Sequence, residues 1–218
     1  MGIYDKQGND LAKMSNPIYG KHVWLVGDSN TDWNRDEFSS LFVDGYGCEY
    51  TSYALAGYAW GTTDADNGFN TTDASGIGQI NTICANAEYP DGEYFEEDKH
   101  IFLFMMGTNA SSGGNGDANT NDASTAYSAM EYCFNKISRY ARVGNAIGVI
   151  IPLAINETDK NNQIALCKKY AIPYIDLNTE ARIYNDNGNN YIAVGNHMGA
   201  NGVKQWKRII GKWVAYCI

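Results

Sequence analysis

The stretch His22–Asn30 reads HVWLVGDSN, in which an apolar run of strand length leads directly into a glycine, an aspartate and a serine. A serine at the carboxyl end of a parallel strand stands at the edge of the sheet where open α/β folds bind their ligands. Gly27 permits a tight turn there, and a following helix directs backbone N–H groups toward the site. The same residues also suit an ordinary strand-to-helix turn capped by Asp28 or Ser29. Evidence that this turn carries a functional serine must therefore come from the rest of the chain.

Strand-length apolar runs alternate with helical patterns along the chain, which is typical of βα units and a parallel sheet. The runs IFLFMM and AIGVII are continuous rather than alternating, as expected of strands covered on both faces. Apolar residues recur every three or four positions in the helical segments 126–140, 164–171 and 203–217. A short helix is expected after Asn34, with Asn34 and Glu37 as a capping pair. The predicted strands are His22–Val26, Tyr50–Leu55, Ile101–Met106, Ala146–Ile151 and Pro173–Asp176.

The length of 218 residues suits one domain, which we place at residues 21–218 behind a lead-in segment at 1–20. Two segments rich in Gly, Asn, Asp, Ser and Thr, 61–78 and 110–123, are predicted loops. Loops of this length in a compact domain are often functional. Because both leave the sheet at the edge where Ser29 is expected, we predict that they shape a substrate pocket.

The net charge and the hydropathy of the chain limit the kinds of partner that are expected. A formal net charge of −9 repels polyanions, so nucleic acid is not expected as a partner. No apolar run reaches about 20 residues, so no membrane span is expected. The first residues, MGIYDKQGNDLAKMSN, contain no signal peptide, which favours a cytoplasmic protein or part of a phage virion.

The chain has five cysteines, and they are widely spread: Cys48, Cys84, Cys133, Cys167 and Cys217. No C-x-x-C pair and no Cys/His spacing suits zinc, so no metal and no cofactor are predicted. Four of the cysteines lie in apolar or helical contexts, where a free thiol is usually a small buried hydrophobe. The odd count argues against a disulfide framework and favours folding in a reducing compartment.

Three further residues stand at the ends of predicted elements. Gly57 follows the second strand, where its N–H could approach a bound group or merely make a turn. Asn109 follows the third strand, and its amide could donate to an oxyanion or bond its own backbone. His197 lies in a polar loop before the last helix, where it could be a general base or a surface residue. His22 and His100 begin strands and are expected to be structural or exposed.

Ser29, Gly57, Asn109 and His197 occur in four separate blocks, in an order that resembles the SGNH (GDSL-like) hydrolase family. GDSN at 27–30 matches the first block, and IPYIDL at 172–177 looks like the family's final core strand. The resemblance runs from about Lys21 to the end of the chain. It implies an α/β fold: a single-domain, three-layer α/β/α sandwich with a five-stranded parallel sheet of the flavodoxin-like type.

Carried over by position, the resemblance implies that Ser29 is the nucleophile and His197 the general base. It also implies an oxyanion hole formed by the backbone N–H groups of Ser29 and Gly57 and by the amide of Asn109, with Asp28 in a supporting role. Ser29 would attack an ester carbonyl, the oxyanion hole would hold the tetrahedral intermediate, and water would release the acyl group.

The chain departs from the family pattern at two positions. The family usually has an aspartate three residues before the histidine, where this chain has Val194, and an aspartate after the asparagine, where it has Ala110. His197 would then be oriented by a backbone carbonyl or by another acid, for which Asp186 is a candidate. A misoriented histidine can lower turnover by about 10⁴-fold in serine proteases. The site could therefore be fully active, slow or inactive.

Three functions remain open. The first is an esterase for small acyl groups, most naturally acetyl groups on a carbohydrate, because Trp33, Tyr58 and Trp60 near the motifs could stack on sugar rings. Those aromatic residues, like Tyr46, Tyr50 and Tyr53, could equally pack the core. The second is a weak or inactive carbohydrate-binding or structural module of a phage tail or bacterial surface assembly. The third, a flavodoxin-like nucleotide or flavin binder, lacks a Gly-rich phosphate loop.

Overall fold

The computed structural model of the chain describes residues 6, 15–61, 75–87, 98–109, 126–141, 144–153, 155–179, 192–194 and 197–218. Its centre is a five-stranded parallel sheet in the order β2-β1-β3-β4-β5. This is the flavodoxin-like order, so the predicted fold class is confirmed. The strands are β1 (His22–Gly27), β2 (Glu49–Ser52), β3 (His100–Met105), β4 (Ala146–Ile151) and β5 (Tyr174–Asp176).

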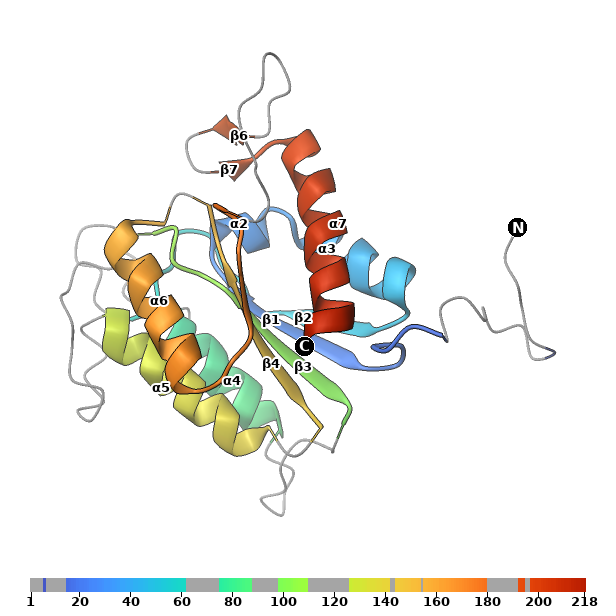
Figure 1. The fold of residues 1–218 in the computed structure, drawn as a ribbon, viewed down its shortest axis with the longest axis horizontal. Coiled ribbons are helices and arrows are strands. Elements are labelled where there is room, and N and C mark those ends of the chain that lie inside the picture. Colours follow the sequence, from blue (N-terminus) through green and yellow to red (C-terminus); the bar gives the residue numbers. More distant parts are fainter. Residues whose placement is uncertain are drawn as a thin grey trace.

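Helices cover both faces of this sheet and complete three layers. α4, α5 and α6 lie on one side of it, and α3 and α7 lie on the other (Figure 1). The helices are α2 (Ser29–Asp32), α3 (Arg35–Ser39), the π-helix η1 (Ser40–Gly45), α4 (Gly76–Ala87), α5 (Ala126–Tyr140), α6 (Glu157–Lys169) and α7 (Ala200–Cys217).

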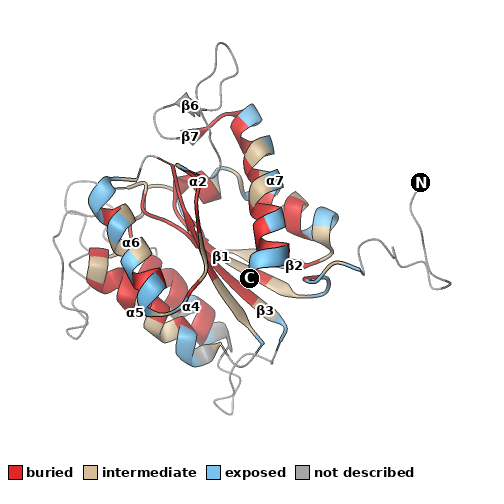
Figure 2. Cartoon of the chain, viewed as in Figure 1, coloured by how far each residue is buried: buried red, intermediate tan, exposed pale blue. Residues whose placement is uncertain are grey.

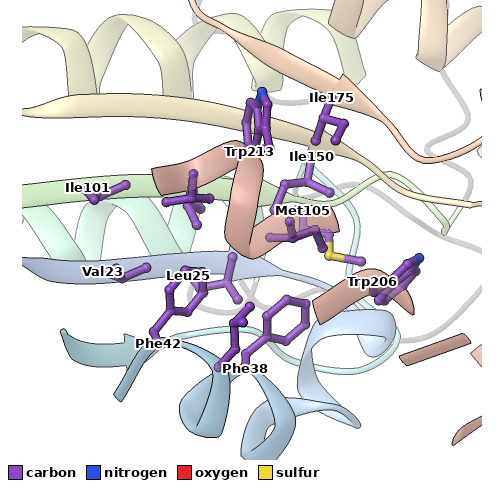
Figure 3. Packing of buried hydrophobic residues seen from close by; sticks show 14 of the residues in the cluster. Val23, Leu25, Phe38, Phe42, Ile101, Met105, Ile150, Ile175, Trp206 and Trp213 are labelled. Atoms are coloured by element: carbon purple, nitrogen blue, oxygen red, sulfur yellow. The ribbon is translucent and has the colours of Figure 1, made fainter. Parts of the chain in front are cut away.

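Each face of the sheet carries its own core because successive strand residues point to opposite sides. Val23 and Leu25 pack with α3, η1 and α7, whereas Val26 packs with α4, α5 and α6. Figure 3 shows Leu25, Met105 and Ile150 in the first cluster, near the α7 residues Trp206 and Trp213. The buried residues lie along the sheet and on the helix surfaces that face it (Figure 2). Burying one large apolar side chain contributes about 1.5–3 kcal/mol, so these two clusters hold the strand ends in place.

The predicted capping pair of Asn34 and Glu37 is wrong. Asn34 is the N-cap residue of α3, but its side chain makes no capping hydrogen bond. Its amide instead donates to the carbonyl oxygen of Asn30 (2.7 Å), at the end of α2. The Glu37 carboxylate pairs with Lys207 of α7 (2.8 Å). The Asn34 side chain thus makes a local contact with the end of α2, and the Glu37 side chain makes a tertiary one with α7.

Three segments differ from their predicted form. β2 ends at Ser52, whereas the sequence predicts a strand to Leu55. α4 begins at Gly76, inside the predicted loop 61–78. The rest of the predicted loops, residues 62–74 and 110–123, lies outside the described residues. A small antiparallel pair that was not predicted, β6 (Ile192–Val194) and β7 (His197–Met198), precedes α7.

Packing extends into the residues before β1. The Ile18 side chain is 4% exposed and belongs to the same core cluster as Val23 and Leu25. Its carbonyl oxygen also accepts a hydrogen bond from the Cys48 thiol (3.1 Å).

None of the helices in the described part of the chain is long and apolar enough to cross a membrane.

All five cysteines are free; Cys217 is exposed, and the other four are buried as predicted. Burial raises the pKa of Cys48 to about 11 and that of Cys167 to about 12. Because the thiolate is the nucleophilic form, burial makes these two thiols weaker nucleophiles at neutral pH than an exposed thiol.

Candidate active site

The turn after β1 can be made only with glycine at position 27. A Cβ atom on Gly27 would lie 2.2 Å from Thr31 Oγ1 and 2.9 Å from the carbonyl oxygen of Met105. The Gln79 side chain of α4 holds the backbone of Gly27 on both sides, accepting from its N–H (3.0 Å) and donating to its carbonyl (3.0 Å). This arrangement places Ser29, which is 4% exposed, at the start of α2.

Asp28 links this turn to the end of β3. Its side chain is 0% exposed and caps α2 by accepting from the N–H of Asn30 (3.1 Å). The other carboxylate oxygen accepts from the N–H groups of Gly107 (3.1 Å) and Thr108 (3.0 Å). Burial raises the pKa of Asp28, and the three N–H donors act in the opposite direction. The predicted supporting residue therefore joins the serine turn to the segment that carries Asn109.

The residues after β3 are held against the same turn. Gly107 has a φ of +125°, a conformation open essentially to glycine alone. The Asn30 amide donates to Thr108 Oγ1 (2.9 Å), and the Gln163 amide of α6 donates to the carbonyl oxygen of Met106 (2.8 Å). The Asn109 amide donates one hydrogen bond to the carbonyl oxygen of Tyr58 (2.8 Å). An amide has two N–H groups, so a second donor remains for another acceptor.

Gly57 lies between two anchored residues. On one side, the N–H of Ala56 donates to Asp32 Oδ2 of α2 (3.0 Å). On the other side, Tyr58 accepts the hydrogen bond from Asn109. Gly57 itself has a φ of +85°, in the left-handed region that favours glycine. The segments that carry Gly57 and Asn109 are thus in direct contact, and both are tied to the turn that carries Ser29.

His197 reaches Ser29 across 168 positions of sequence: its Nε2 lies 2.7 Å from Ser29 Oγ. The sequence predicted a polar loop here, but His197 is part of β7, and its pairing partner in β6 is Val194. The ends of α2 and β7 lie close together beside the sheet (Figure 1). Asp186, the candidate for orienting this ring, lies outside the described residues.

Trp33 packs directly on the imidazole. The ring centroids of Trp33 and His197 are 3.9 Å apart, and the ring planes are inclined by 25°. Trp33 nevertheless remains 62% exposed. The sequence placed Trp33 near the site but gave no sign of this stack, because the ring of residue 197 comes from a different part of the fold.

The other aromatic residues near the motifs are less exposed than Trp33: Trp60 is buried, and the tyrosines are half-buried, namely Tyr46, Tyr50, Tyr53 and Tyr58. Trp60 is 0% exposed and packs against Phe104 and Phe134, so it cannot stack on a sugar. Tyr50 stacks on Phe42, and Tyr53 stacks on Trp24. Of the suggested sugar-binding tryptophans, only Trp33 is on the surface.

His22 and His100 are structural, as predicted. His22 stacks on Trp24 at 4.0 Å and lies 2.9 Å from Thr51 Oγ1 through its Nε2. The indole N–H of Trp24 donates to His100 Nδ1 (3.1 Å). Both histidines begin their strands, so they lie at the opposite edge of the sheet from Ser29.

Besides the stack of Trp33 on His197, sequence reasoning did not find the ion pair of Asp32 and Arg35. Arg35 donates to Asp32 Oδ1 (2.7 Å) and to the carbonyl oxygen of Ala54 (2.7 Å). Together with the bond from Ala56 N–H to Asp32, it holds both ends of the turn that leads to Gly57. The i,i+3 spacing is the only signal in the sequence, and it is common on helix surfaces.

Within the described ranges, no three His, Cys, Asp or Glu side chains cluster so as to hold a metal ion.

Substituting Gly107 with alanine is expected to destabilise the fold by about 2–4 kcal/mol, because backbone strain and overpacking add. The new Cβ atom would lie 2.5 Å from Gln163 Nε2 and 2.8 Å from Ile155 Cδ1. Urea denaturation measures the loss. Gly20→Ala is the matched control: Gly20 has a φ of +75° but no atom within 4 Å of the new Cβ, so only about 1 kcal/mol of backbone strain is expected. Equal losses in the two variants would contradict the close packing at Gly107.

The sequence matches no protein-family model, and no curated protein is significantly similar to it. Solved structures do resemble it. A protein described as a GDSL-like lipase from Bacteroides ovatus superposes with a TM-score of 0.64 at 14% identity, over 89% of this chain and 98% of its own. One from Bacteroides uniformis, with the same description, gives 0.62 at 15%, over 91% and 96%. A carbohydrate acetylesterase family member from Sinorhizobium meliloti gives 0.51 at 15%, over 89% and 97%. At these identities the similarity establishes the fold alone, which this chain shares with the GDSL-like structures.

Proposed function

We propose that the protein is a serine esterase in which Ser29 is the nucleophile and His197 the general base. The observation that carries this proposal is the distance of 2.7 Å between Ser29 Oγ and His197 Nε2, which is short enough for direct proton transfer. The pair lies where β1 ends, at the sheet edge at which this class of fold binds ligands. The fold shared with structures described as lipases and acetylesterases supports the same reaction class.

The reaction follows from this geometry. His197 Nε2 accepts the hydroxyl proton as Ser29 Oγ attacks the ester carbonyl carbon, and the carbonyl π electrons move to oxygen. When the tetrahedral intermediate collapses, the alcohol leaves with the proton from His197, and an acyl-serine remains. Water then attacks the acyl carbon while His197 again takes the proton. The carboxylic acid leaves, and Ser29 regains its hydrogen.

The tetrahedral oxyanion needs hydrogen-bond donors where its charge develops. The N–H of Ser29 begins α2 and so has no partner within the helix. We assign the other two donors to the N–H of Gly57 and the second N–H of Asn109. The contact between the Asn109 amide and Tyr58 supports this assignment, because it fixes the asparagine beside the Gly57 turn.

The Asn109→Ala variant is expected to lose about 10²- to 10³-fold in kcat with little change in KM, because the lost donor acts mainly in the transition state. Steady-state kinetics with p-nitrophenyl acetate measures this. Asn161→Ala, at an exposed position on α6, should retain wild-type rates. A rise in KM with an unchanged kcat would remove Asn109 from the oxyanion hole.

We further propose that the substrate is a small acyl ester, most naturally an acetyl group, carried on a carbohydrate. Trp33 supports the carbohydrate part. One face of its indole lies on His197, yet the residue is 62% exposed, which leaves apolar ring surface beside the serine turn. Such a surface suits the apolar face of a sugar ring. The family name of the Sinorhizobium meliloti structure points to the same substrate class.

Acetate release from an acetylated xylo-oligosaccharide tests this substrate, with Ser29→Ala as the control. The proposal expects acetate release that needs Ser29, and a kcat/KM for p-nitrophenyl esters that falls as the acyl chain lengthens. Val194, at the position where the family has an aspartate, motivates the competing function, an inactive carbohydrate-binding module. Binding of the oligosaccharide without any release of acetate or p-nitrophenol would establish that module and overturn the esterase.

A further inference from the structure

Trp33 and Ser29 belong to one rigid turn. Trp33 is the C-cap residue of α2, and its N–H donates to the carbonyl oxygen of Ser29 (3.0 Å). Its side chain reaches over to β7 and stacks on the His197 imidazole at 3.9 Å. The backbone of α2 thereby fixes Ser29 relative to Trp33, the residue that covers the ring of His197.

This stack acts on the face of the imidazole ring. A hydrogen bond to Nδ1, as the family's aspartate would make, controls the ring in its own plane. A stacked indole instead limits rotation of the ring out of that plane and keeps Nε2 directed at Ser29. The two kinds of restraint are independent, so the stack contributes whatever group bonds to Nδ1.

The stack also favours the charged form of the base. During the reaction His197 becomes an imidazolium, and the electron-rich face of an aromatic ring attracts a cation within about 6 Å of its centroid. Tryptophan is the strongest such partner among the aromatic side chains. The attraction is larger for the imidazolium that forms in the transition state than for the imidazole that accepts the proton, so it lowers the barrier rather than tightening substrate binding.

We propose that Trp33 is a positioning residue for His197, which holds the imidazole toward Ser29 and stabilises its protonated form. The inference rests on the proposed function of Ser29 and His197. It is distinct from the suggested contact of Trp33 with a sugar, which would involve the part of the indole that does not face His197. The two roles separate experimentally, because positioning affects kcat and sugar contact affects KM.

The test compares Trp33→Leu, Trp33→Phe and wild type on p-nitrophenyl acetate, a substrate without a sugar. Trp33→Leu is expected to lower kcat by about 2- to 30-fold with KM unchanged, which corresponds to about 0.5–2 kcal/mol. Trp33→Phe, which keeps an aromatic face, should recover most of this loss. Tyr216→Leu is the matched control: it removes an aromatic side chain that is 74% exposed near the end of α7, and it should leave kcat unchanged.

A second readout does not depend on activity. Proton NMR should show the His197 ring protons shifted upfield by the indole in wild type and by the phenyl ring in Trp33→Phe, and moved downfield in Trp33→Leu. His197→Gln assigns these signals by their disappearance. The proposal is overturned if Trp33→Leu keeps the wild-type kcat, changes KM alone, or leaves the ring-proton shifts unaltered. If wild type itself shows no esterase activity, the proposed function fails, and the NMR comparison still decides whether Trp33 holds the ring.

Discussion

Ser29→Ala and His197→Ala should each lower kcat/KM for p-nitrophenyl acetate by roughly 10⁴- to 10⁶-fold, and the double variant should be no slower than either single variant. The reason is that one proton-transfer step needs both groups: without Ser29 Oγ there is no nucleophile, and without His197 Nε2 its proton has no acceptor at 2.7 Å. Steady-state kinetics of the three variants measures this coupling.

Ser39→Ala serves as the control for the serine substitution. Ser39 is the last residue of α3, and its side chain makes no capping hydrogen bond. Its removal should leave kcat/KM within about twofold of wild type, as expected of a group outside the reaction. Losses of Ser29 and His197 that multiply in the double variant would show that the two residues act independently, contrary to the mechanism.

Asp28→Asn is expected to reduce the free energy of unfolding by about 1–3 kcal/mol although it changes no volume. In wild type both carboxylate oxygens accept hydrogen bonds, from the N–H of Asn30 on one side and from those of Gly107 and Thr108 on the other. An amide offers only one oxygen, so its NH₂ group must face at least one backbone N–H in either orientation. A buried donor then loses its acceptor.

The same substitution should also lower kcat, because the segment from Gly107 to Asn109 loses its link to the serine turn. Urea denaturation and steady-state kinetics measure the two effects on one preparation. Asp36→Asn is the matched control at an exposed position in the first turn of α3, and it should change the free energy of unfolding by less than about 0.5 kcal/mol. If Asp28→Asn is as stable as Asp36→Asn, the link assigned to Asp28 is wrong.

The strands show what the sequence can predict about this fold. β4 matches its predicted bounds, Ala146–Ile151, because its apolar run is clearly bounded on both sides. β2 is shorter than predicted, since the chain leaves the sheet after Ser52 and turns toward Gly57. α4 was not predicted, and Gly76 and Gly78 at its start suggest a loop. A Cβ on Gly76 would lie 3.0 Å from Met106 and Trp60, so close packing explains that glycine.

The site, like the fold, could be predicted from the sequence only in part. The apolar runs placed Ser29 and Asn109 at strand ends, the resemblance suggested their roles, and the sheet order brings those ends together. The position of His197 on a two-residue strand carries no sequence pattern, because so short a strand has no periodicity. Nor could the sequence distinguish Trp33 from Trp60: one covers the imidazole and the other fills the core. That difference arises only when elements distant in sequence pack together.

Labelling with a fluorophosphonate probe tests the central claim most directly, because the probe forms a covalent bond only with an activated serine. We expect the wild-type chain to be labelled at Ser29, as located by mass spectrometry of the peptide, and both Ser29→Ala and His197→Ala to remain unlabelled. A folded wild-type protein that takes up no label, or that is labelled equally well without His197, would contradict the proposal that these two residues form a working nucleophile and base.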